Sequence, residues 1–167
     1  MSVFKESGIE FDFTRAQSVV KHDEAPRNTF WSGVDFCIED SPDESIWLEV
    51  KSWNPARMEP KWRGGNQRRF VSEMKSAAFS LKMRSKFFGT SAFFGWQGDP
   101  LPETVRYILV FEPPRRIDSA LTLAFSHKIK SQIAPPKSVA WRSRINVSVL
   151  GLSEWNQRFP DYPARIF

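Results

Sequence analysis

The stretch from Gly33 to Trp53, GVDFCIEDSPDESIWLEVKSW, contains two apolar runs separated by an acidic segment. The runs predict β-strands at about 33–39 and 46–53. Residues 39–45 between them are rich in turn-forming types. The stretch therefore predicts a β-hairpin whose two strands lie side by side.

Side chains alternate between the two faces of a strand, so the hairpin also predicts where its charged groups lie. Glu49 and Lys51 share one face of the second strand, and Asp35 lies on one face of the first. The residues predicted on the opposite, apolar faces are Val34, Phe36 and Ile38 on the first strand and Leu48 and Val50 on the second. We expect the two carboxylates to face the same way.

Two carboxylates beside a lysine suit metal-assisted cleavage of a phosphodiester. Carboxylate oxygens hold hard divalent cations, and a lysine can orient water or stabilise negative charge on the phosphate. The pattern Glu-x-Lys occurs three times in the chain, but only Glu49–Lys51 combines strand context with an upstream acid. The alternative interpretation is a solvated strand face that carries a cross-strand ion pair.

At these residues the chain resembles the PD-(D/E)XK nuclease superfamily. The resemblance implies an α/β, restriction-endonuclease-like fold: a mixed β-sheet flanked by helices, with an αβββαβ core. It implies that Asp35, Glu49 and Lys51 are catalytic, and that the substrate is DNA or RNA. Val34 stands where many members have proline, and Glu6 and Glu10 are the candidates for an acidic residue on a preceding helix.

In the mechanism that this resemblance implies, Mg²⁺ or Mn²⁺ is held by Asp35, Glu49 and the backbone carbonyl of Val50. Lys51 positions or activates the attacking water. The metal stabilises the pentacovalent phosphate and the leaving oxygen.

Length and composition fit one globular domain spanning 1–167, since 41% of the residues are hydrophobic, with 15 Phe and 7 Trp. No apolar run approaches the roughly 20 residues of a membrane span, and the N-terminus lacks the apolar core of a signal peptide. We therefore expect a cytoplasmic protein. One cysteine, Cys37, and two histidines, His22 and His127, are too few for a His/Cys zinc cage.

The charge distribution favours an anionic partner, and we expect nucleic acid, with DNA preferred. The net charge is +5, but residues 51–86 contain ten Lys or Arg against two Glu, a net of +8. The rest of the chain has fourteen basic and seventeen acidic residues, a net of −3. The residues predicted to contact nucleic acid are Arg63, Arg68, Lys75, Lys82 and Lys86.

Four of these five residues lie on a predicted helix from Gln67 to Phe88, which Gly89 is expected to end. At 100° per residue, Arg68, Lys75, Lys82 and Lys86 form a narrow stripe that could follow a phosphate backbone. Either Lys75 or Lys82 could instead turn toward the carboxylates. Residues 54–67 before the helix predict a long loop, where Trp62 beside Arg63 could stack on a base or pin the loop to the core.

Further elements complete the predicted α/β domain. Strands are expected at about 16–20, 107–111 and 145–150, and helices at 117–133 and 152–159. The continuous apolar run 107–111 predicts a strand that is buried on both faces.

The sequence thus predicts a metal-dependent nuclease. The alternatives are a nucleic-acid-binding module without activity on the same scaffold, and an interaction protein whose charge is incidental. It leaves the oligomeric state open, a homodimer included.

Overall fold

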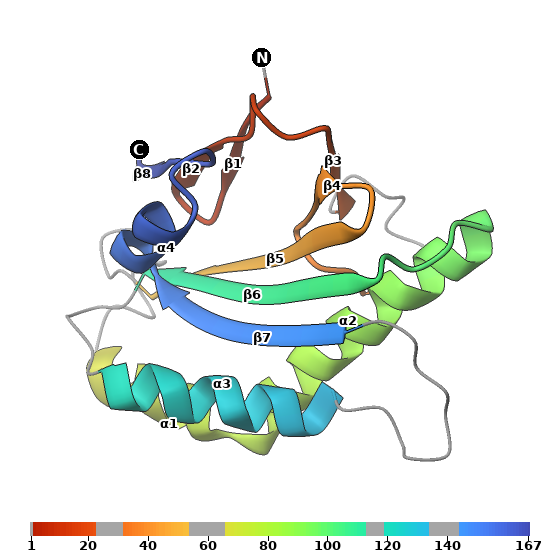
Figure 1. The fold of residues 1–167 in the computed structure, drawn as a ribbon. Helices are drawn as coiled ribbons and strands as arrows, with labels where there is room; N and C mark the ends of the chain where they lie inside the picture. The colour runs from red at the N-terminus through yellow and green to blue at the C-terminus, as the bar shows by residue number, and fades with distance from the viewer. Residues whose placement is uncertain (1, 23–31, 54–65, 113–118, 134–143) are drawn as a thin grey trace.

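A computed structural model describes residues 2–22, 32–53, 66–112, 119–133 and 144–167 (Figure 1). Of residues 66–69 it describes the backbone only.

A mixed five-stranded sheet forms the centre of the fold, with the strand order β3-β4-β5-β6-β7. The first three strands are antiparallel, and β6 and β7 continue the sheet in parallel with β5. Their bounds are β3 Ser18–Lys21, β4 Phe36–Ser41, β5 Glu44–Ser52, β6 Thr104–Glu112 and β7 Arg144–Gly151. The predicted hairpin is confirmed as β4 and β5, and the predicted strands at 107–111 and 145–150 are confirmed as β6 and β7.

Different layers cover the two faces of this sheet (Figure 1). Three helices lie against one face: α1 Asn66–Lys75, α2 Ala77–Gln97 and α3 Ser119–Ile133. The other face carries helix α4 Leu152–Arg158 and a small antiparallel sheet of β1 Val3–Glu6, β2 Ile9–Asp12 and β8 Ala164–Ile166. The expected mixed sheet flanked by helices is therefore present. No helix in the described residues is long and apolar enough to cross a membrane.

The central strands are buried on both faces, which makes two hydrophobic cores. Trp47 of β5 packs into the core under the helices, whereas Leu48 and Val50 pack into the core under the small sheet. Val34 was expected on the same face as Phe36, but it lies in the core under the helices. The reason is that β4 begins only at Phe36, so the alternation of a regular strand does not extend back to Val34.

The single helix expected from Gln67 to Phe88 is instead two helices, and Gly89 does not end the second. Ser76 begins α2 because its side chain accepts a hydrogen bond from Phe79 N at 3.0 Å. The helix continues to Gln97 and ends at Gly98, which adopts a left-handed conformation with φ 77°. Gly89 allows a close backbone approach, since a Cβ atom there would lie 2.3 Å from the carbonyl oxygen of Ser32.

The start of the chain also differs from the αβββαβ order that the resemblance implied. No α-helix occurs in residues 2–22, where the structure has β1, β2 and β3. The two candidates for a helix-borne acid therefore lie on strands, Glu6 at the end of β1 and Glu10 in β2. Glu6 pairs with Lys21 and Glu10 with Arg165, so these contacts do not direct either carboxylate toward Asp35 or Glu49.

Candidate functional site

The site begins where β4 and β5 separate. The ladder between the two strands ends at the pair Phe36–Leu48, and Asp35 lies one residue beyond it. There Val50 N donates a hydrogen bond of 2.6 Å to Asp35 Oδ2. The side-chain carboxylate of Asp35 thus accepts the bond in place of a backbone carbonyl of a neighbouring strand. Asp35 is 2% exposed, so a carboxylate is held at this point with little access to water.

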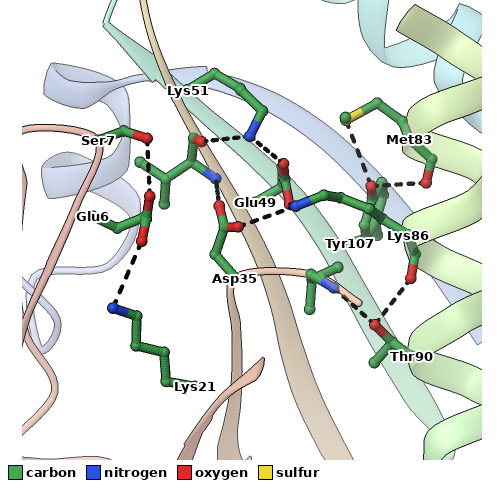
Figure 2. A network of polar contacts seen from close by, with 12 residues as sticks. Glu6, Ser7, Lys21, Asp35, Glu49, Lys51, Met83, Lys86, Thr90 and Tyr107 are labelled. Carbon is green, nitrogen blue, oxygen red and sulfur yellow. Dashed lines mark hydrogen bonds and ion pairs between the residues drawn. The ribbon is translucent and has the colours of Figure 1, made fainter. Parts of the chain in front are cut away.

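Glu49 is fully buried on β5, and its carboxylate faces that of Asp35 across one shared cation (Figure 2). The Nζ atom of Lys86 lies 2.6 Å from Glu49 Oε2 and 3.1 Å from Asp35 Oδ1. The two acids that the hairpin pattern singled out therefore point to the same place, within reach of a single positive group.

Lys51 lies beside this pair, as Figure 2 shows. Its ammonium group is 2.5 Å from Glu49 Oε1 and donates a hydrogen bond of 3.1 Å to the backbone carbonyl of Val50. The Lys51 side chain is 25% exposed, whereas those of Asp35, Glu49 and Lys86 are at most 10% exposed. Lys51 is thus the most accessible side chain of the four, at the boundary between the buried charges and the solvent.

Lys86 is the site residue whose position the sequence analysis assigned wrongly. It was expected on an exposed basic stripe, but it belongs to the buried face of α2 together with Met83, Phe87 and Thr90. The break at Ser76 separates α1 from α2, so the four basic residues do not share one continuous helix. The signal that identifies Lys86 is its spacing, because the buried Met83 and Thr90 lie three residues before it and four residues after it.

A second set of contacts fixes α2 against the segment that carries Asp35. Thr90 Oγ1 donates a hydrogen bond of 3.0 Å to Lys86 O and accepts one of 3.0 Å from Val34 N. Together with the close approach of Gly89 to Ser32, this bridge holds the backbone of Lys86 at a set position relative to Asp35.

The electrostatics of the site follow from its burial. Burial raises the pKa of Glu49, and the charge of Asp35 adds to this, against the opposing effect of Lys51 and Lys86. Burial alone would lower the pKa of Lys86, but the negative charges of Glu49 and Asp35 outweigh it and raise that pKa. Two carboxylates and two ammonium groups give the site no net formal charge.

Tyr107 of β6 lies beside Glu49 and Lys86, next to Met83 (Figure 2). Its hydroxyl donates a hydrogen bond of 3.0 Å to Met83 O. Burial raises the pKa of Tyr107 well above its ordinary value, with a further contribution from Glu49 and Asp35. The phenol is therefore neutral.

The remaining residues predicted to bind nucleic acid lie away from the carboxylates or outside the described residues. Lys75 on α1 and Lys82 on α2 are exposed, and neither turns toward the carboxylates. Arg63 and Trp62 lie outside the described residues, as does the side chain of Arg68.

Cys37 and His22 form a separate contact near the same end of β4. Cys37 is buried, and its Sγ lies 3.1 Å from His22 Nε2. Burial, followed by the charge of Glu39, raises the pKa of the Cys37 thiol well above its ordinary value. A buried thiol with a raised pKa is protonated and therefore a poor nucleophile.

The donor atoms of the site suit a hard divalent cation. The described residues contain no group of three or more His, Cys, Asp or Glu placed to hold a metal, so within them a cation at Asp35 and Glu49 would take its further ligands from the backbone or water. Glu49 Oε1 is buried and has no hydrogen-bond partner within the described residues, although it forms an ion pair with Lys51. Carboxylate and carbonyl oxygens with several waters are a normal ligand set for Mg²⁺.

Comparisons of the chain with protein-family models, with curated proteins and with solved structures gave no match.

Proposed function

We propose that the protein is a metal-dependent nuclease of the PD-(D/E)XK type, with a restriction-endonuclease-like fold. Its substrate is nucleic acid, DNA in preference to RNA, and its cofactor is Mg²⁺ or Mn²⁺. One observation carries the proposal: Asp35, Glu49 and two lysines meet in a buried site where β4 and β5 separate.

Burial makes a purely structural role for these charges expensive. Removing ions from water costs several kcal/mol each, and packed apolar residues of similar volume are often as stabilising as a buried ion pair. Glu49 lies between fully buried apolar residues on its strand: Trp47 belongs to the core under the helices, and Leu48 and Val50 belong to the core on the opposite face. A site that keeps two carboxylates here is more readily explained by chemistry than by stability.

Each group has a role in this proposal. The carboxylates of Asp35 and Glu49 and the carbonyl of Val50 would hold the cation, which supplies Lewis-acid stabilisation of the phosphate when bound. Lys51, which is partly exposed and contacts the Val50 carbonyl, would orient the attacking water and balance the charge that grows on the phosphate. The hydrogen bond from Val50 N holds Asp35 Oδ2, whereas Lys86 contacts the other oxygen of that carboxylate.

Exposed cations on the helices would supply the binding surface. Lys75, Lys82 and Arg84 are exposed on α1 and α2. They would contact phosphates without reading bases, which gives affinity that depends on salt but little sequence specificity.

One observation favours a second candidate, a nucleic-acid-binding module without activity. Lys86 already contacts both carboxylates, so together with Lys51 it balances their negative charge without a metal. This candidate predicts salt-dependent binding of oligonucleotides and no cleavage under any metal condition.

A cleavage screen distinguishes the two. Single- and double-stranded DNA and RNA are incubated with Mg²⁺, with Mn²⁺, and with chelator, using the wild type, Asp35→Asn and the matched surface variant Asp99→Asn. Asp99 is exposed, whereas Asp35 is buried in the site, so the same chemical change is made in two environments.

We expect cleavage by the wild type and by Asp99→Asn that chelator abolishes, and none by Asp35→Asn, because the loss of one carboxylate removes a ligand charge. Cleavage by Asp35→Asn at the wild-type rate would contradict the assigned site. Binding without cleavage in every wild-type reaction would favour the second candidate.

A further inference from the structure

We propose that Lys86 is a resident counterion that competes with the divalent metal for Asp35 and Glu49, so that metal binding requires its ammonium group to leave the site. The inference rests on the proposed metal site and deepens it. It assigns to Lys86 the control of metal affinity rather than a contact with nucleic acid.

The geometry places the ammonium group where a shared cation would have to lie. Lys86 Nζ contacts one oxygen of each carboxylate, at 2.6 Å for Glu49 and 3.1 Å for Asp35. No other positive group in the described residues contacts both acids, since Lys51 pairs with Glu49 alone. A metal that binds both carboxylates would therefore need the position that the Lys86 ammonium group occupies.

Charge makes simultaneous occupancy unfavourable. With both lysines in place the site is neutral, and a divalent cation would add two positive charges beside the Lys86 ammonium group. Like charges at contact distance in a poorly solvated site repel strongly. Metal binding therefore favours a state in which Lys86 has moved out and the carboxylates are balanced by the metal and Lys51.

The helix allows such movement without unfolding. The backbone of Lys86 is fixed by Thr90 and by the close approach of Gly89 to Ser32, so only the side chain needs to change. Its four-carbon stem can stay packed while the ammonium group moves toward water. The Lys86 side chain is 10% exposed, so part of it already reaches the surface.

The first test uses the wild-type protein. Brief labelling with an amine-reactive acylating reagent, read by mass spectrometry, compares Lys86 with Lys82 in the absence and presence of Mg²⁺. We expect Lys86 to be protected without metal and labelled several-fold more with it. Lys82 is exposed on the same helix and should be labelled equally in both conditions.

The second test measures metal affinity without substrate. Calorimetric titration of Mn²⁺ compares the wild type, Lys86→Met and the control Lys82→Met. Methionine keeps an unbranched, flexible chain and removes the charge. We expect Lys86→Met to bind Mn²⁺ roughly ten-fold more tightly, which corresponds to about 1.4 kcal/mol, and Lys82→Met to match the wild type.

The outcomes separate this inference from the proposed function. Metal binding by the wild type with unchanged Lys86 labelling, or with weaker binding by Lys86→Met, would overturn the inference and leave the metal site in place. Absence of Mn²⁺ binding by the wild type and by Lys86→Met would overturn the metal site and the inference with it. If Lys86→Met does not fold, the labelling result decides the question.

Discussion

The bridge made by Thr90 gives the sharpest test of how the site is held together. Thr90 is fully buried, and its hydroxyl joins the carbonyl of Lys86 to the backbone N–H of Val34, each at 3.0 Å. Thr90→Val keeps the shape of the side chain and removes the hydroxyl. The Lys86 carbonyl keeps its helical partner, but Val34 N loses its acceptor inside the core. A buried donor left unpaired costs about 1–3 kcal/mol.

Ser91 provides the matched control for this prediction. Its hydroxyl also donates a bond of 3.0 Å to the carbonyl four residues earlier, Phe87 O, and no backbone N–H donates to it in the described contacts. Ser91→Ala should change the free energy of unfolding by no more than about 0.5 kcal/mol. Urea unfolding measures both, and Thr90→Val should shift the midpoint without a change in slope. A Thr90→Val loss no larger than that of Ser91→Ala would refute the bridge.

Three further predictions concern the charges. The pKa of Glu49 is raised in the folded state, so the folded state binds a proton more tightly than the unfolded state. The resulting stabilisation is complete below about pH 4.5, and it is lost as pH rises through the folded pKa. Urea unfolding at a series of pH values from 4 upward should show the free energy of unfolding falling with pH in the metal-free wild type and not in Glu49→Gln. An equal pH dependence in the two proteins would contradict the burial effect. Lys51→Ala should keep near-normal affinity for nucleic acid and lose single-turnover cleavage, because its charge matters most in the transition state; full turnover at saturation would place Lys51 in the binding surface. Lys82→Ala should do the reverse, lowering the salt slope of binding by about 0.7–0.9, and an unchanged slope would exclude a phosphate contact.

The hairpin could be predicted from sequence because two local signals agree there. Turn-forming residues separate two apolar runs, and the strand period puts Asp35, Glu49 and Lys51 in phase. The structure places these three side chains around one point. The apolar run 107–111 was also enough to predict its strand, because a strand without polar alternation is buried on both faces. In the structure, residues 107–111 of β6 are all buried.

The strand expected at about 16–20 is confirmed as β3, but β1 and β2 could not be predicted because their structure depends on distant pairing. β2 pairs with β8, so residues 9–11 have partners at 164–166. Short strands of four and three residues carry too little periodicity to be recognised alone, and neither end of the chain contains the evidence for the other. The expected helix before the sheet came from the resemblance and not from a periodic pattern in those residues.

Lys86 shows why a charge pattern alone misplaces a site residue. On a continuous helix its angular position groups it with Arg68, Lys75 and Lys82, and a basic stripe is ordinarily solvated. The break at Ser76 ends that phase, and within α2 the relevant neighbours of Lys86 are Met83 and Thr90. A lysine flanked at helical spacing by buried residues must either reach water or find an anion.

The strand pattern independently supplies two anions, Asp35 and Glu49, that are themselves too buried to be solvated. A buried cation and two buried anions each lack a solvent partner, so they contact one another, and Lys51 and Val50 N add to these contacts. The helix and hairpin patterns together therefore imply a contact that neither implies alone. The same reasoning supports the proposed metal exchange: carboxylates already organised around one positive charge would exchange it for a cation of higher charge.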